Sequence, residues 1–212
     1  MRTLLAAAVL ACSATHALAQ ACPSQGAHLQ VLGSGDASLT AARAQSGFLL
    51  WREGRARAMV NAGSGTALRL REAGADVRDL AVVLLASLGP EASADLPTLL
   101  LAMRQSGRST PLLVLGPGST DAARSPGTRG LLGALVAQPY GAWRGLDSLL
   151  TQGKPFAVFV DDLDTARSLP HRVAERDGLS VFVAGNGAGA LAWRVELGGG
   201  AAGAFLPPRA PA

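Results

Sequence analysis

Residues 80–97 read LAVVLLASLGPEASADLP, a continuous apolar run followed by a short loop and an amphipathic pattern. The run Leu80–Leu85 predicts a strand buried on both faces, as in parallel sheets. Asp95 stands where a helix cap is expected, and Pro97 falls in the first helical turn, where its missing N–H costs little. The i, i+3, i+4, i+7 spacing predicts a helix that buries Leu96, Leu99, Leu100 and Met103.

The segments on either side extend this strand–loop–helix unit into an alternating pattern. Ser64 or Thr66 is expected to cap a short helix at 66–73, which Gly74 ends. Further helices are predicted at 127–136 and 145–150. Strands are predicted at 28–32, 47–51, 56–60, 80–85, 112–115, 156–160, 179–184 and 191–197. The pattern indicates a layered α/β fold with mixed sheets.

Composition places the chain among globular proteins of one domain. It has 212 residues, of which 49% are hydrophobic and 16% charged, which argues against disorder. Beyond the N-terminus no apolar run is long enough for a membrane helix, so a polytopic membrane protein is excluded. The net charge of +4 comes from 18 arginines and the single lysine Lys154. Arginines such as Arg52, Arg57, Arg78 and Arg104 are scattered, so we expect solvated side chains and no nucleic-acid partner.

The first 19 residues are predicted to be a signal peptide. Arg2 supplies a positive charge, an apolar stretch follows, and Ala17-Leu18-Ala19 fits a cleavage site after Ala19. A lipoprotein signal with Cys12 as the lipidated residue is the alternative. Both forms indicate export. Cleavage after Ala19 predicts a periplasmic or secreted protein with no membrane contact beyond export. The remaining chain divides into a domain at 20–197, in which Cys22 is the only cysteine, and a flexible tail at 198–212.

Three segments together resemble the metallo-β-lactamase superfamily, especially its ribonuclease Z and arylsulfatase-like branch. They are Val31-Leu32-Gly33-Ser34-Gly35, Val60 through Leu68, and Leu84 through Pro97, in that order and spacing. The resemblance implies an αββα sandwich with mixed sheets. It also implies that the fold is truncated, because the family continues through a further αβ segment and another histidine.

The resemblance further implies that the family's metal site is lost. Family members hold one or two metal ions, usually zinc, in a His-x-His-x-Asp-His loop. The four matching positions here are Ser87, Gly89, Glu91 and Ala92, and Asn61 replaces the preceding aspartate. We therefore expect no bound metal, no other cofactor and no catalytic residue. We expect the remaining histidines, His28 and His171, to be ordinary surface residues.

These residues lead to a pseudoenzyme hypothesis with two rivals. A vacated pocket lined by Asn61, Ser87, Glu91 and Asp95 would leave a non-catalytic binding or interaction protein. Its partner would be a small molecule, a second copy, or an intact family member. The first rival is a hydrolase of esters, sulfate esters or phosphodiesters with a weak metal site at Glu91 and Asp95. The second is a decayed remnant without function.

The acidic run of Asp161, Asp162 and Asp164 is interpreted as a solvated turn and not as a cation site.

Overall fold

The first of two β sheets has six strands in the order in which they occur along the chain. In this computed structural model, residues 25–40, 42–119, 126–137, 141–198 and 201–205 are described. Neighbouring strands are antiparallel from β1 to β3 and parallel from β3 to β6, so the sheet is mixed. The strands are β1 (Ala27–Gly33), β2 (Gly47–Arg52), β3 (Arg55–Val60), β4 (Val82–Leu84), β5 (Leu112–Pro117) and β6 (Val158–Leu163).

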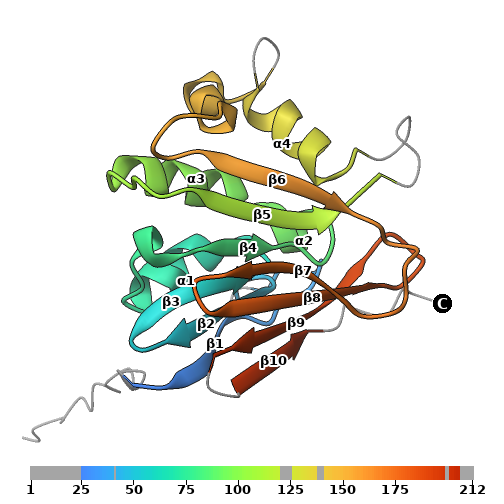
Figure 1. The fold of residues 1–212 in the computed structure, drawn as a ribbon. Coiled ribbons are helices and arrows are strands. Elements are labelled where there is room, and N and C mark those ends of the chain that lie inside the picture. Colours follow the sequence, from blue (N-terminus) through green and yellow to red (C-terminus); the bar gives the residue numbers. More distant parts are fainter. Residues whose placement is uncertain (1–24, 41, 120–125, 138–140, 199–200, 206–212) are drawn as a thin grey trace, which may run out of the picture.

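The second sheet is antiparallel throughout and lies face to face with the first (Figure 1). Its order is β10-β9-β8-β7, and the hairpin between β8 and β9 turns at Asn186-Gly187, as the sequence predicts. Trp193 is buried between the two sheets with Leu50 and Leu84. The strands are β7 (His171–Arg176), β8 (Leu179–Gly185), β9 (Leu191–Leu197) and β10 (Ala201–Phe205).

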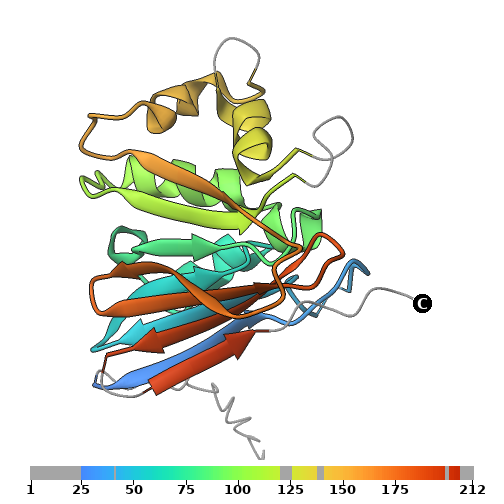
Figure 2. The ribbon, with the colours of Figure 1, turned by 45° about the vertical axis from the view of Figure 1, so that its right-hand side comes forward.

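Helices cover the other face of the first sheet (Figure 2). As predicted, α3 buries Leu96, Leu99, Leu100 and Met103 in that layer. The elements are α1 (Thr66–Glu72), η1 (Val77–Asp79), α2 (Pro90–Ser93), α3 (Leu96–Gln105), α4 (Thr128–Val136) and η2 (Arg144–Leu150), where η marks a 3-10 helix. The described residues therefore form three layers: the helices, the mixed sheet and the antiparallel sheet.

Two strands fall where no strand is predicted. His171 was expected in a polar loop, but it begins β7. This strand lies at the edge of its sheet, and its charged residues interrupt the apolar pattern that would predict a strand. The segment 198–212, expected to be a loose tail, contains β10, which pairs with β9 along its whole length. Its sequence, AAGAF, has weak strand propensity, so the pairing with β9 outweighs local preference.

The predicted signal peptide at 1–19 lies outside the described residues, as do Cys12 and Cys22. Within the described ranges, every helix is too short or too polar to cross a membrane.

Candidate functional site

The candidate site lies where β3 and β4 end. Because these two strands are parallel, Asn61 after β3 and the loop at 86–95 after β4 meet at the same edge of the first sheet. The second sheet reaches the same place, since the Leu191 N–H donates to the Ala86 carbonyl at 2.8 Å. We call this edge the loop end of the sandwich. Asn61 and the loop therefore lie at one place in the fold.

Asn61 ties the loop to the first sheet. Its Oδ1 accepts a hydrogen bond from the Ala86 N–H, and its Nδ2 donates to Ser46 Oγ, both at 2.8 Å. The residue is buried and has a φ of 60°, a left-handed conformation that asparagine tolerates better than most residues. Ser46 was not singled out from the sequence, because its contact spans 15 residues and leaves no local pattern.

Ser87 and Glu91 bind to each other. The Ser87 hydroxyl donates to Glu91 Oε1 at 2.9 Å. The Glu91 carboxylate fills the space beside Gly89, where an added Cβ would collide with it. Ala92 is buried, and its carbonyl accepts from the Ala62 N–H at 2.7 Å. The four positions that hold metal in the family thus carry one hydroxyl, one carboxylate and two residues without polar side-chain atoms.

Asp95 lies at the start of α3 but caps a different helix. Its Oδ2 accepts from the Ala67 N–H in the first turn of α1 at 2.9 Å, and it makes no side-chain bond to its own helix. The predicted cap of α1 by Ser64 or Thr66 is wrong. The N-cap is Gly65 with a φ of 87°, and the Thr66 hydroxyl donates to the Gly63 carbonyl instead. Asp95 therefore holds α1 and α3 together across 28 residues of sequence.

This donor set does not fit the family's metal ions. Zinc sites of this kind are built from imidazoles and carboxylates. The loop offers no imidazole and two carboxylates, Glu91 bound to Ser87 and Asp95 bound to the Ala67 N–H. Among the described residues, no three histidine, cysteine, aspartate or glutamate side chains gather closely enough to hold a metal ion.

The two histidines of the described part differ from the expectation of ordinary surface residues. His28 is half-buried in β1 and stacks on Trp51, with ring centroids 5.6 Å apart and an interplanar angle of 11°. Its neighbour in the ladder is the same tryptophan, which explains the stacking. His171 is half-buried at the start of β7, where its Nδ1 lies 3.2 Å from the Leu169 carbonyl.

The acidic residues at the end of β6 bind the start of a helix. Asp162 Oδ1 accepts from the Arg129 N–H in the first turn of α4 at 2.8 Å, and Asp161 pairs with the Arg129 side chain at 3.2 Å. Asp164 accepts from the Ala166 N–H within its own turn. All three aspartates are exposed, as expected of solvated residues. The predicted turn is wrong for Asp161 and Asp162, because they belong to β6 and pair with β5.

A hollow of about 500 Å³ lies between α3 and η2 on the helix layer. Its lining is mostly apolar and includes Pro97, Leu101 and Trp143. None of the four residues predicted to line a vacated pocket takes part in it. A ligand site formed by Asn61, Ser87, Glu91 and Asp95 therefore stays a prediction.

No model of a protein family matches the chain, and no curated protein matches it. Solved structures do. Human tRNase Z, short form, gives a TM-score of 0.58 at 18% identity over 80% of this chain. The metallo-beta-lactamase fold protein YhfI from Bacillus subtilis gives 0.55 at 14% over 80%, and a long form RNase Z from yeast gives 0.51 at 11% over 81%. The match covers 64%, 57% and 27% of those chains, respectively. The chain has the metallo-β-lactamase fold, and the resemblance noted from the sequence is confirmed at that level.

Proposed function

We propose that this chain is an exported pseudoenzyme of the metallo-β-lactamase fold that acts by binding a partner and not by metal-dependent hydrolysis. One observation carries the proposal. Every polar side chain at the vacated metal loop is bound within the protein: Ser87 to Glu91, Asn61 to Ala86 and Ser46, and Asp95 to Ala67.

The hydrolases of this fold need a metal-bound hydroxide, and therefore a cluster of free ligands at one point. Here the corresponding groups serve to fix the loop. Breaking one of these buried or half-buried hydrogen bonds to release a ligand costs about 1 kcal/mol per bond. A metal held only by Glu91 and Asp95 would have to compete with Ser87 and with the N-terminus of α1 for those carboxylates.

The partner that fits this proposal best is a protein, either a second copy or an intact relative of the same fold. A small-molecule ligand at the loop end is the alternative partner. Export to the periplasm or beyond follows from the charged and apolar start of the sequence and its Ala17-Leu18-Ala19 site.

The second candidate function is hydrolysis with an atypical metal site. It is favoured by the two carboxylates of the loop, Glu91 and Asp95, since oxygen ligands suit Mg²⁺ or Mn²⁺. That function requires metal-dependent turnover of an ester, a sulfate ester or a phosphodiester, and Glu91→Gln should abolish it.

The experiment compares the natural chain with E91Q and with a loop-restored variant, S87H/G89H/E91D/A92H. Gly89 has a φ of −63°, which suits any residue, and the E91D change shortens the side chain that would meet the new Cβ. Turnover of p-nitrophenyl acetate, p-nitrophenyl sulfate and bis-p-nitrophenyl phosphate is measured with added Zn²⁺ or Mn²⁺. The proposal expects equal, background rates for the natural chain and E91Q, and tighter zinc binding for the restored loop. Metal-dependent turnover that E91Q abolishes would replace the proposal with the hydrolase.

A further inference from the structure

Four arginines gather at the end of the sandwich opposite the loop end. Arg52 ends β2, Arg57 lies in β3, Arg108 precedes β5 and Arg176 ends β7, so they come from both sheets. Arg52 and Arg176 end strands that run away from Asn61 and the loop at 86–95, while Arg57 lies in the first half of β3 and Arg108 precedes β5. We call this group the arginine end.

Three of the four converge on the turn between β7 and β8. Arg57 Nη2 lies 3.0 Å from Asp177 Oδ2, and Arg176 Nε lies 3.9 Å from the same oxygen. Arg52 Nη1 donates to the Asp177 carbonyl at 3.2 Å. The turn is tight, with a φ of 51° at Asp177 and 76° at Gly178, and a Cβ at Gly178 would collide with the Arg52 guanidinium. The Asp177 carboxylate thus lies near two guanidinium groups, and a third binds the carbonyl of the same residue.

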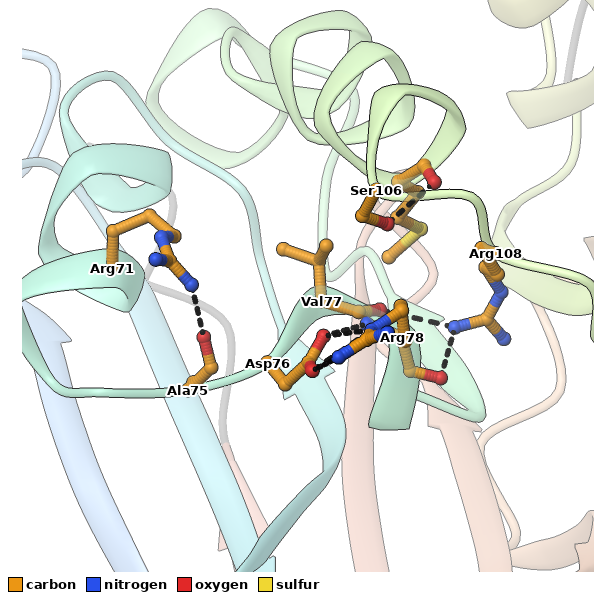
Figure 3. Close-up of polar contacts among 8 residues, drawn as sticks. Arg71, Ala75, Asp76, Val77, Arg78, Ser106 and Arg108 are labelled. Carbon is orange, nitrogen blue, oxygen red and sulfur yellow. Dashed lines mark hydrogen bonds and ion pairs between the residues drawn. The ribbon is translucent and has the colours of Figure 1, made fainter.

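The fourth arginine is buried, and all its hydrogen bonds go to carbonyls. Arg108 donates to the carbonyls of Thr110 at 2.7 Å, Val77 at 3.0 Å, Arg78 at 2.9 Å and Pro111 at 2.9 Å. Figure 3 shows the bonds to the Val77 and Arg78 carbonyls. Burial, together with the nearby positive charges of Arg176 and Arg57, lowers the pKa of Arg108 to about 10. The cations of this end therefore repel one another.

The carboxylates nearby do not balance these charges. Asp76 is already held by Arg78, whose Nε and Nη2 both contact it (Figure 3). Asp177 and Asp79 remain, and Asp79 contributes its carbonyl, not its carboxylate, to Arg57 at 2.9 Å. Glu53 and Arg55, beside Arg52, add one charge of each sign. The four guanidinium groups and two carboxylates therefore still leave an excess of positive charge. The side chains of Arg176 and Asp177 are 37% and 51% exposed, so this excess faces solvent.

We propose that the arginine end binds a phosphate or sulfate group beside Asp177, between Arg57 and Arg176. A guanidinium presents parallel N–H groups that match two oxygens of such an anion, and several arginines around one point add charge to that geometry. Arg176 makes no bond shorter than 3.9 Å to Asp177, which leaves its N–H groups for an incoming oxygen. The inference is independent of the proposed function, because it concerns the opposite end of the fold.

Calorimetric titration of the full chain with inorganic phosphate and with sodium sulfate tests the proposal, with sodium chloride at equal ionic strength as the blank. Arg176→Gln is compared with Arg172→Gln, a charge-matched control on the same strand whose exposed side chain pairs with Glu175. We expect R176Q to weaken binding about fivefold or more and R172Q to leave it nearly unchanged. Asp177→Asn removes the competing carboxylate and should tighten binding.

Circular dichroism melts establish that each variant is folded before it is titrated. Binding of the full chain to phosphatidylglycerol vesicles is measured in a separate experiment. Binding to the free ions assigns a soluble phosphate or sulfate compound as the ligand, and binding to vesicles alone assigns a lipid headgroup. The proposal is overturned if neither the ions nor the vesicles bind, or if folded R176Q and R172Q weaken binding equally.

Discussion

The two ends of the sandwich satisfy their polar groups in opposite ways. At the loop end, Asn61, Ser87 and Asp95 bond to backbone or to one neighbouring side chain, and each has its partner within the protein. At the arginine end, Arg52, Arg57 and Arg176 share one aspartate residue, and cations outnumber carboxylates.

Chemistry in layered α/β folds usually sits at the carboxyl ends of the strands. In this chain the polar side chains at that end, the loop end, are bound by hydrogen bonds within the protein. The excess positive charge lies at the arginine end, near the amino ends of the parallel strands.

The largest effect is expected from Arg108 at the arginine end. Arg108→Ala leaves four carbonyls without their donor in a buried place, which should lower the free energy of unfolding by about 3 kcal/mol. Urea denaturation measures the loss. The exposed Arg104→Ala is the control, with an expected loss below about 0.5 kcal/mol. Equal losses would mean that Arg108 does not hold this end together.

At the loop end, Asn61→Ala removes both amide bonds and puts alanine at a φ of 60°, for an expected loss of about 2 kcal/mol. Asn61→Asp should cost less than half as much, because its carboxylate still accepts from the Ala86 N–H and the Ser46 hydroxyl can turn to donate. Thermal melts at pH 7 compare the two variants. A larger loss for N61D than for N61A would show that the hydrogen-bond network is wrongly assigned.

A smaller effect is expected from Asp95, which caps α1 from the start of α3. Asp95→Ala should lower stability by about 1 kcal/mol through loss of the bond to the Ala67 N–H. Asp95→Asn keeps an acceptor oxygen and loses only the charge at the helix N-terminus, so its loss should be smaller. Hydrogen exchange of the Ala67 amide gives a local measurement. Unchanged exchange in D95A would contradict the cap.

The smallest effect is expected on the stability of the protein at low pH. Bonds from Arg78 lower the pKa of Asp76 to about 2, against an ordinary value near 4. A depressed folded-state pKa stabilises the protein above about pH 4, and that stability is lost as the pH falls towards 2. The pair is exposed and screened by solvent, so the loss should be small. Urea unfolding between pH 2 and 5 should be less pH-dependent in D76N. Identical pH profiles would contradict the binding of Asp76 by Arg78.

Patterns local in sequence predicted much of the fold. Continuous apolar runs located β4 and β5, and the loop at 86–95 could be matched to the family's metal loop from order and spacing. Strands β7 and β10 escaped detection, because one is an edge strand rich in charge and the other is mostly alanine and glycine.

The bonds that define each end are long-range and left no local pattern. Asn61 meets Ala86 across 25 residues, and Asp95 meets Ala67 across 28. The arginines looked scattered in the sequence because they lie on separate strands and loops. The approach of the second sheet to the first brings them together, as Arg52 and the turn at Asp177 do across 125 residues.

The metal content of the folded, full-length protein tests the central claim most directly. The chain is expressed with zinc, iron and manganese supplied, purified without chelators and assayed by elemental analysis, with S87H/G89H/E91D/A92H as the positive control. A loop whose polar groups are bound within the protein predicts a metal content far below one ion per chain. A content near one ion per chain would contradict the pseudoenzyme and point to metal ligands at the loop end.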